Sequence, residues 1–239
     1  MPVLLVLFVG ILCLVGAGLI LLLPFHDQRK RAKQDRCPSS ACPSPDISLL
    51  PWPVCWLAVR TRNLAAVQSA LGLQNPKPCS CWEGLAGGKG IFIAPPVRGW
   101  VLVSGFGLPD PSEDVDACFR FVLDLSRKLG AVHFFRVSRA VHHHAWVKAK
   151  RGRIVRAYAW AGKTLWTQGA QTPAEEELNF KCYDYATQPE TNIAGWPEGV
   201  AENVDKVLLL AARWSLDPAL VDESFLEGRG VVGEPTLHY

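Results

Sequence analysis

The chain has 239 residues, with 25 Lys plus Arg against 22 Asp plus Glu, so its formal charge is +3. Hydrophobic residues make up 49% of the composition. These values exclude a disordered, collagen-like or acidic-tail protein and are typical of a folded protein. The average hides an uneven distribution, because residues 1–24 contain no charged side chain.

Residues 3–23 form an unbroken run of 21 apolar residues. As a helix, this run would be roughly 31 Å long and would match the hydrocarbon core of a bilayer. A cleaved signal peptide would need a basic start, a shorter apolar region and a small-residue cleavage site, and the sequence has none of these. We therefore predict a transmembrane helix over residues 1–24, with the lipid bilayer as its partner.

The charges beside this run predict its orientation. Residues 25–36 carry five basic and two acidic side chains, whereas only the amino terminus is basic before the run. Basic flanks stay in the cytoplasm. We expect a single-pass protein of the cell membrane with its N-terminus outside and its C-terminal domain in the cytoplasm. In that compartment the eight cysteines are expected to be reduced thiols.

Residues 25–51 combine the basic flank with a linker rich in Pro and Ser, so the folded domain is expected to span residues 52–239. Its Gly-rich end, from about residue 228, is predicted to be a flexible tail. Subtracting the 5 basic and 3 acidic residues of segment 25–51 from the totals leaves 20 and 19, a net charge of +1. This balance excludes electrostatic binding of nucleic acid.

The folded part is predicted to be an α+β domain. A ferredoxin-like βαββαβ order is expected for its first six elements, in a mixed or antiparallel sheet that extra hairpin strands and C-terminal helices extend. Capping residues mark two of the helices, which are expected to begin after Asp110 and Thr172. The expected strands are 52–61, 91–94, 100–104, 131–137, 144–150, 153–160 and 164–167, and the expected helices are 63–71, 111–129, 173–178 and 201–214.

Three consecutive histidines suggest a metal site. His142 and His144 would share one face of a strand, and His133 on the preceding strand could supply a third ligand. The alternative is that these histidines simply begin a strand. No C-x2-C pair of zinc ligands occurs, and we expect no cofactor.

The hairpin of residues 144–160 offers a second candidate site, for a ligand bound by Trp146, Lys148 and Arg156. Alternation along the strand places Arg156 on the core side, where a guanidinium needs a buried carboxylate or a ligand. The nearest acidic residues in the sequence are Glu175, Glu176 and Glu177. The expected partner is therefore either an internal carboxylate, a small acidic ligand or a protein.

No phosphate-binding loop and no nucleophile elbow is present. The sequence favours a membrane-anchored protein, not an enzyme, whose cytoplasmic α+β domain is a binding or protein-interaction module. The alternative is a metal-dependent enzyme with its site around His142 and His144.

Overall fold

The computed structural model describes residues 52–87, 90–185, 187, 199–217 and 221–236. The predicted transmembrane helix, its basic flank and the linker lie outside these residues and stay predictions. Among the helices of the described ranges, none has the length and apolar character to cross a bilayer.

The described residues form an α+β domain around one antiparallel sheet of nine strands, in the order β2-β9-β3-β4-β1-β5-β6-β7-β8. All seven predicted strands are present. The strands are β1 (Cys55–Val59), β2 (Leu73–Ser80), β3 (Ile91–Ile93), β4 (Val101–Gly105), β5 (Ala131–Ser138), β6 (His143–Lys150), β7 (Arg153–Trp160), β8 (Thr164–Gln168) and β9 (Arg229–Pro235).

The central part of the fold contains the six elements that were expected in a ferredoxin-like βαββαβ order. Strand β1, helix α2 (Leu64–Ala70), strands β3 and β4, helix α4 (Val115–Leu129) and strand β5 follow one another in the chain. Strand β2 and helix α3 (Cys81–Leu85) are inserted before β3. Within the sheet, β1 lies between β4 and β5, and strands β6 to β8 extend it beyond β5.

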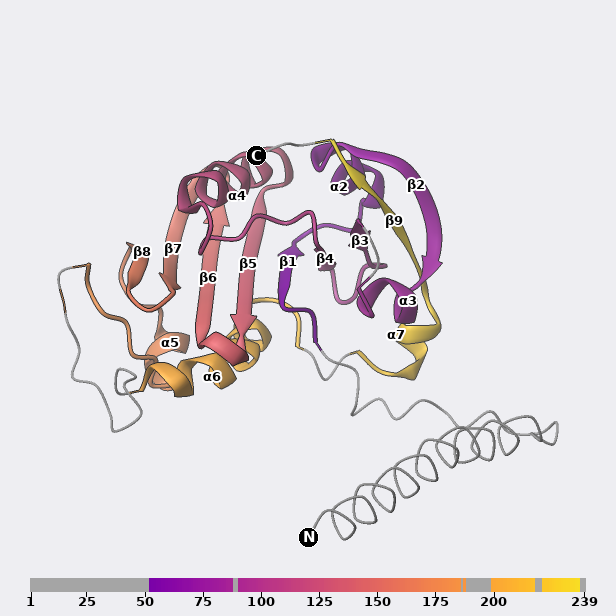
Figure 1. The fold of residues 1–239 in the computed structure, drawn as a ribbon. Coiled ribbons are helices and arrows are strands. Elements are labelled where there is room, and N and C mark those ends of the chain that lie inside the picture. Colours follow the sequence, from indigo (N-terminus) through magenta and orange to yellow (C-terminus); the bar gives the residue numbers. More distant parts are fainter. Residues whose placement is uncertain (1–51, 88–89, 186, 188–198, 218–220, 237–239) are drawn as a thin grey trace, which may run out of the picture. The chain divides into compact units, whose positions relative to one another are not determined.

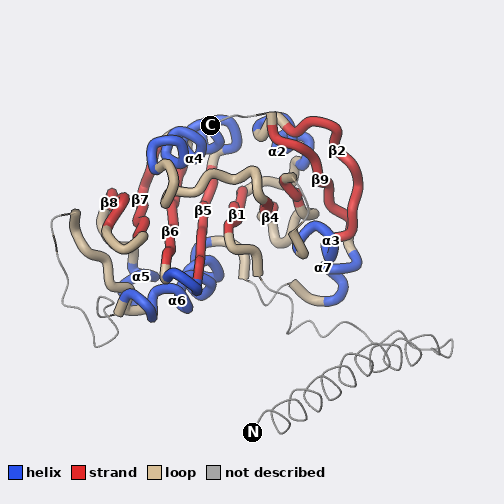
Figure 2. Tube along the Cα trace, viewed as in Figure 1, coloured by secondary structure: helices blue, strands red, loops and turns tan. Residues whose placement is uncertain are grey.

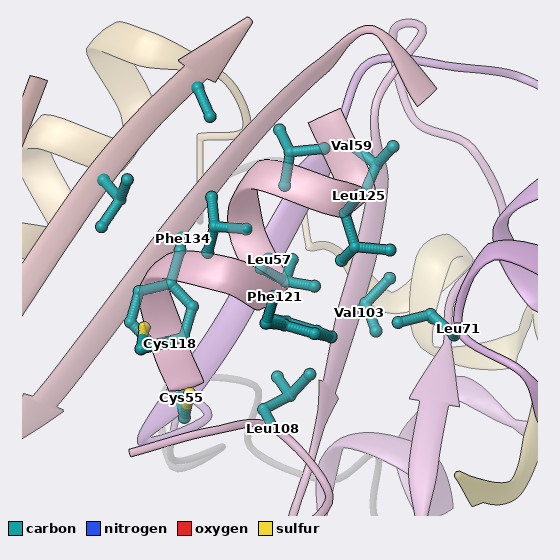
Figure 3. Packing of buried hydrophobic residues seen from close by; sticks show 14 of the residues in the cluster. Cys55, Leu57, Val59, Leu71, Val103, Leu108, Cys118, Phe121, Leu125 and Phe134 are labelled. Atoms are coloured by element: carbon teal, nitrogen blue, oxygen red, sulfur yellow. The ribbon is translucent and has the colours of Figure 1, made fainter. Parts of the chain in front are cut away.

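Helices cover both faces of the sheet (Figures 1 and 2). Helices α2 and α4 cover one face, where Leu57 and Phe134 pack with Phe121 of α4 (Figure 3). Helices α5 (Pro173–Glu177) and α6 (Val200–Trp214) lie on the other face with α3 and α7 (Glu223–Glu227). Neighbouring strand residues such as Trp56 and Leu57 face opposite layers, because side chains alternate along a strand.

The predicted flexible tail is wrong for residues 229–235, which form β9 between β2 and β3. Its glycines have a packing role. A Cβ on Gly230 would lie 2.3 Å from the ring of Phe92, and one on Gly233 would lie 2.7 Å from the Leu73 side chain. Glycine in a strand often marks such a close approach, so the Gly-rich composition reflects packing here.

The predicted start of the long helix is also wrong. Helix α4 begins at Val115, and Asp114 is its N-cap, accepting a hydrogen bond from the backbone of Ala117. Asp110 instead accepts a hydrogen bond from the Ser112 backbone and forms an ion pair with Arg136 of β5. The capping sequence after Asp110 therefore forms a turn, and a long-range ion pair fixes it.

Candidate functional site

A buried ion pair joins Arg156 of β7 to Glu175 of α5. Their side chains are 2% and 0% exposed, and Arg156 Nε donates to Glu175 Oε1 over 2.9 Å. Trp146 Nε1 donates to the same oxygen over 2.7 Å. Glu175 Oε2 accepts from the backbone and hydroxyl of Thr172, which completes the predicted capping box. One carboxylate thus caps a helix and neutralises a buried guanidinium.

The remaining hydrogen-bond donors of the Arg156 guanidinium also have partners within the protein. Nη1 donates to the carbonyl groups of Ala157, Gln168 and Gly169, and Nη2 contacts Cys182 Sγ at 3.2 Å. Burial raises the pKa of the Cys182 thiol to about 11, so the thiol stays neutral. The predicted core position of Arg156 is confirmed, and its partner is an internal carboxylate. This geometry gives no support to ligand binding by Arg156 or by the fully buried Trp146.

Both ring nitrogens of His144 also have partners within the protein. Its Nδ1 lies 3.1 Å from the carbonyl oxygen of His142, which can only accept, so Nδ1 carries the proton. Its Nε2 faces the side-chain amide of Asn203 at 3.4 Å. Asn203 in turn exchanges two hydrogen bonds with the backbone of Lys181. Burial lowers the pKa of His144 to about 4.

The three predicted metal ligands do not come together. His142 precedes β6 and has a left-handed backbone with φ of 51°, so it does not share a strand face with His144. His133 pairs with Lys148, four residues further along β6 than His144. Within the described ranges, no three His, Cys, Asp or Glu side chains form a group that could hold a metal ion.

Lys148, the remaining predicted residue, belongs to a different cluster, which we name the tryptophan cradle: Arg60, Trp100, His133, Lys148 and Trp214. The His133 ring lies between two indoles, at 4.9 Å from Trp100 and 5.7 Å from Trp214. The Arg60 guanidinium lies over Trp100 at 5.6 Å, and Lys148 Nζ lies over Trp214 at 5.1 Å. Two cations thus flank a histidine, each resting on an indole face.

The register of the sheet brings the cradle together. Ala58, His133 and Lys148 are direct neighbours on β1, β5 and β6, and Arg60 lies two residues after Ala58 on the same face. Trp214 reaches the cluster from the last turn of α6. The sequence did not reveal Arg60, Trp100 or Trp214 as partners of Lys148. Their positions depend on the pairing of β1 with β4 and β5 and on the packing of α6, which are tertiary contacts.

The cradle is electrostatically unbalanced. Neither Arg60, which is exposed, nor Lys148, which is half-buried, has an ion-pair partner in the part of the chain that the structure describes. Burial, then Lys148 and Arg60, lowers the pKa of His133 to about 3. The imidazole is therefore neutral. Neither cation forms an ion pair with a described residue, although burial lowers the pKa of Lys148 and the charge of Glu175 raises it by a smaller amount.

Further cations continue this basic surface at the turn between β6 and β7, the hairpin tip, defined by Lys150, Arg151 and Arg153. Arg151 and Gly152 have φ of 48° and 72°, as a two-residue hairpin turn requires. A depression of about 380 Å³ lies beside the three basic side chains. No ion pair to any of the three is present among the described residues.

A second depression, of about 300 Å³, lies at the other end of the sheet, where the described chain begins. Trp52, Val54 and Leu208 contribute to its apolar lining. Arg139 is the one charged residue among the described lining residues, and it pairs with Asp205 over 3.2 Å. This surface is therefore neutral, in contrast to the hairpin tip.

The chain matches no protein family model, no curated protein and no solved structure.

Proposed function

We propose that the protein is a membrane-anchored binding module whose cytoplasmic domain docks an acidic protein partner. The observation that carries this proposal is the group of cations in the tryptophan cradle and at the hairpin tip that form no ion pair with any described residue. They gather at one end of a domain whose net charge is only +1. A local surface of one sign on a near-neutral protein attracts a complementary partner without general polyanion binding.

The position of this surface supports the proposal. Val54 hydrogen-bonds Val137 at one end of the sheet, and Ala131 pairs with Lys150 at the other. The basic surface is thus at the far end of the sheet from Trp52, the first described residue. A partner there would lie at the opposite end of the sheet from the neutral depression that Trp52 and Val54 line. The metal-dependent enzyme has no comparable support, because the three candidate histidines lie apart.

Charge reversal at the hairpin tip tests the docking surface. In the double variant Lys150→Glu, Arg153→Glu we expect affinity for labelled polyglutamate, used as a model acidic chain, to fall at least tenfold at about 0.1 M salt. The measurement is a fluorescence-anisotropy titration of the full-length protein in nanodiscs of neutral phosphatidylcholine.

The matched control is Arg120→Glu, Lys163→Glu, which changes the net charge equally at two exposed positions away from the hairpin tip. It should keep most of the affinity. Equal losses in the two double variants would show a net-charge effect and contradict a docking surface, as would the absence of polyglutamate binding by the wild-type protein.

The proposed orientation has its own test. A reporter enzyme that is active only in the cytoplasm, fused after Tyr239, should be active in intact cells, because the basic flank of residues 25–36 keeps that side of the helix inside. The matching variant replaces the five basic residues of the flank with Gln and should lose much of this activity. Activity only from a reporter specific for the outside would overturn the orientation.

A further inference from the structure

We propose that the tryptophan cradle binds a phosphate group, supplied by a phosphorylated side chain of the acidic partner. This inference rests on the proposed function and names the chemistry that the partner presents. Arg60 follows β1 and Lys148 lies on β6, the two strands on either side of β5 and His133, and each cation lies over an indole face. An anion between them would offset the repulsion of two cations that form no ion pair among the described residues.

Two buried nitrogen atoms in the cradle also lack partners. His133 and Trp214 are only 4% and 8% exposed, yet His133 Nδ1 and Trp214 Nε1 have no hydrogen-bond partner among the described residues. An indole N–H can only donate, and buried donors are nearly always satisfied in native proteins. The oxygen atoms of an anion would supply the acceptor that Trp214 lacks. They would also favour a protonated His133 that donates from Nδ1.

The number of charges favours phosphate over carboxylate. A carboxylate has one negative charge and two oxygens, whereas a phosphorylated side chain has nearly two charges and three acceptor oxygens at neutral pH. The cradle offers a guanidinium fork, an ammonium group and two ring nitrogens, which exceed what one carboxylate can accept. The phosphate group therefore matches both the charge and the donors of the site.

The source of the phosphate follows from the topology. Arg60 lies after the end of β1, whereas Trp52, toward which the proposed anchor leads, lies before its beginning. The cradle thus lies at the same end of the sheet as the hairpin tip, where Lys150 is two residues from Lys148 on β6. A phosphorylated side chain of the partner proposed to dock at the hairpin tip would therefore be within reach of the cradle.

The experiment is calorimetric titration of the full-length protein in phosphatidylcholine nanodiscs. The probes are inorganic phosphate, a phosphoserine peptide with acidic flanks, and the same peptide without phosphate. We expect one phosphate per chain and at least tenfold tighter binding of the phosphopeptide than of its unmodified form. Arg60→Gln and Lys148→Gln should each weaken phosphate binding at least tenfold, Arg60→Lys should restore part of it, and Lys163→Gln should have no effect.

Substitution of His133 should have two effects that a purely structural role would not produce together. Because its Nδ1 is buried without a partner, His133→Phe should raise the midpoint of thermal unfolding in the absence of phosphate and also weaken phosphate binding. His133→Leu serves the same purpose if the larger ring disturbs the packing against Trp100. A variant that loses stability and keeps phosphate affinity would contradict the assignment.

The inference is overturned if phosphate shows no saturable binding in the millimolar range, or if Arg60→Gln and Lys148→Gln bind it like the wild type. Binding only to vesicles that contain a phosphoinositide, and not to the phosphopeptide, would overturn the proposed source. Loss of polyglutamate binding in the hairpin-tip variant, without any phosphate binding by the wild type, would leave the proposed function standing and reject the cradle.

Discussion

Replacing Glu175 by alanine is expected to lower the free energy of unfolding by about 3–5 kcal/mol, the usual cost of removing one partner of a buried ion pair. The carboxylate accepts hydrogen bonds from Arg156, from Trp146 and from both donors of Thr172. Without it, a guanidinium that is 2% exposed keeps its charge and loses its counter-ion. The loss is a large part of the roughly 5–15 kcal/mol that stabilises an average domain. Urea denaturation at neutral pH measures it.

Glu177 on the same helix is the matched control. It pairs with Arg213 over 2.7 Å, but both side chains are 58% exposed. An exposed pair contributes at most about 1 kcal/mol, so Glu177→Ala should change stability little. The double variant Arg156→Met, Glu175→Leu should recover a substantial part of the loss, because it buries no unpaired charge. Equal effects of Glu175→Ala and Glu177→Ala would contradict the buried ion pair.

The sequence indicated the buried ion pair more clearly than it indicated a functional site. Alternation along residues 153–160 placed Arg156 on the buried side, and the capping box at Thr172 predicted the helix that carries Glu175. Both are local patterns. The choice between an internal carboxylate and a ligand depended on where α5 packs, and that is a tertiary contact. Local patterns therefore identified the residue that needs a partner and left the partner open.

Residues 73–80 were not among the expected strands, yet they form β2. Its Pro76 and Pro78 argue against a strand, but β2 is an edge strand, where a missing N–H on the open side is tolerated. The tryptophan cradle joins residues from β1, β5, β6 and α6 together with Trp100, which directly precedes β4. Nothing in the sequence near Lys148 indicates Arg60, because their proximity depends on the order of strands in the sheet.

Acid should destabilise the domain through its two buried histidines. Burial lowers the pKa of His133 to about 3 and that of His144 to about 4, whereas both titrate near 6.5 in an unfolded chain. Between pH 6.5 and 4 the unfolded state therefore binds more protons than the folded state, so the free energy of unfolding falls as the pH falls. Each histidine contributes at most about 1.4 kcal/mol per pH unit and half of that at pH 6.5, so the pair removes roughly 4 kcal/mol between pH 6.5 and 4.5.

Variants separate this effect from the titration of carboxylates. The groups facing His133 are Lys148 and Arg60, and those facing His144 are His142 and His143. His133→Phe removes one titrating imidazole, so the slope of stability against pH between 6.5 and 4.5 should fall by about half the histidine contribution. Leu209→Gln, at an exposed position of α6, removes no titrating group and is the control, which should keep the wild-type slope. Urea denaturation at several pH values measures both slopes. If His133→Phe leaves the slope between pH 6.5 and 4.5 unchanged, His133 is not a neutral buried imidazole in the folded domain.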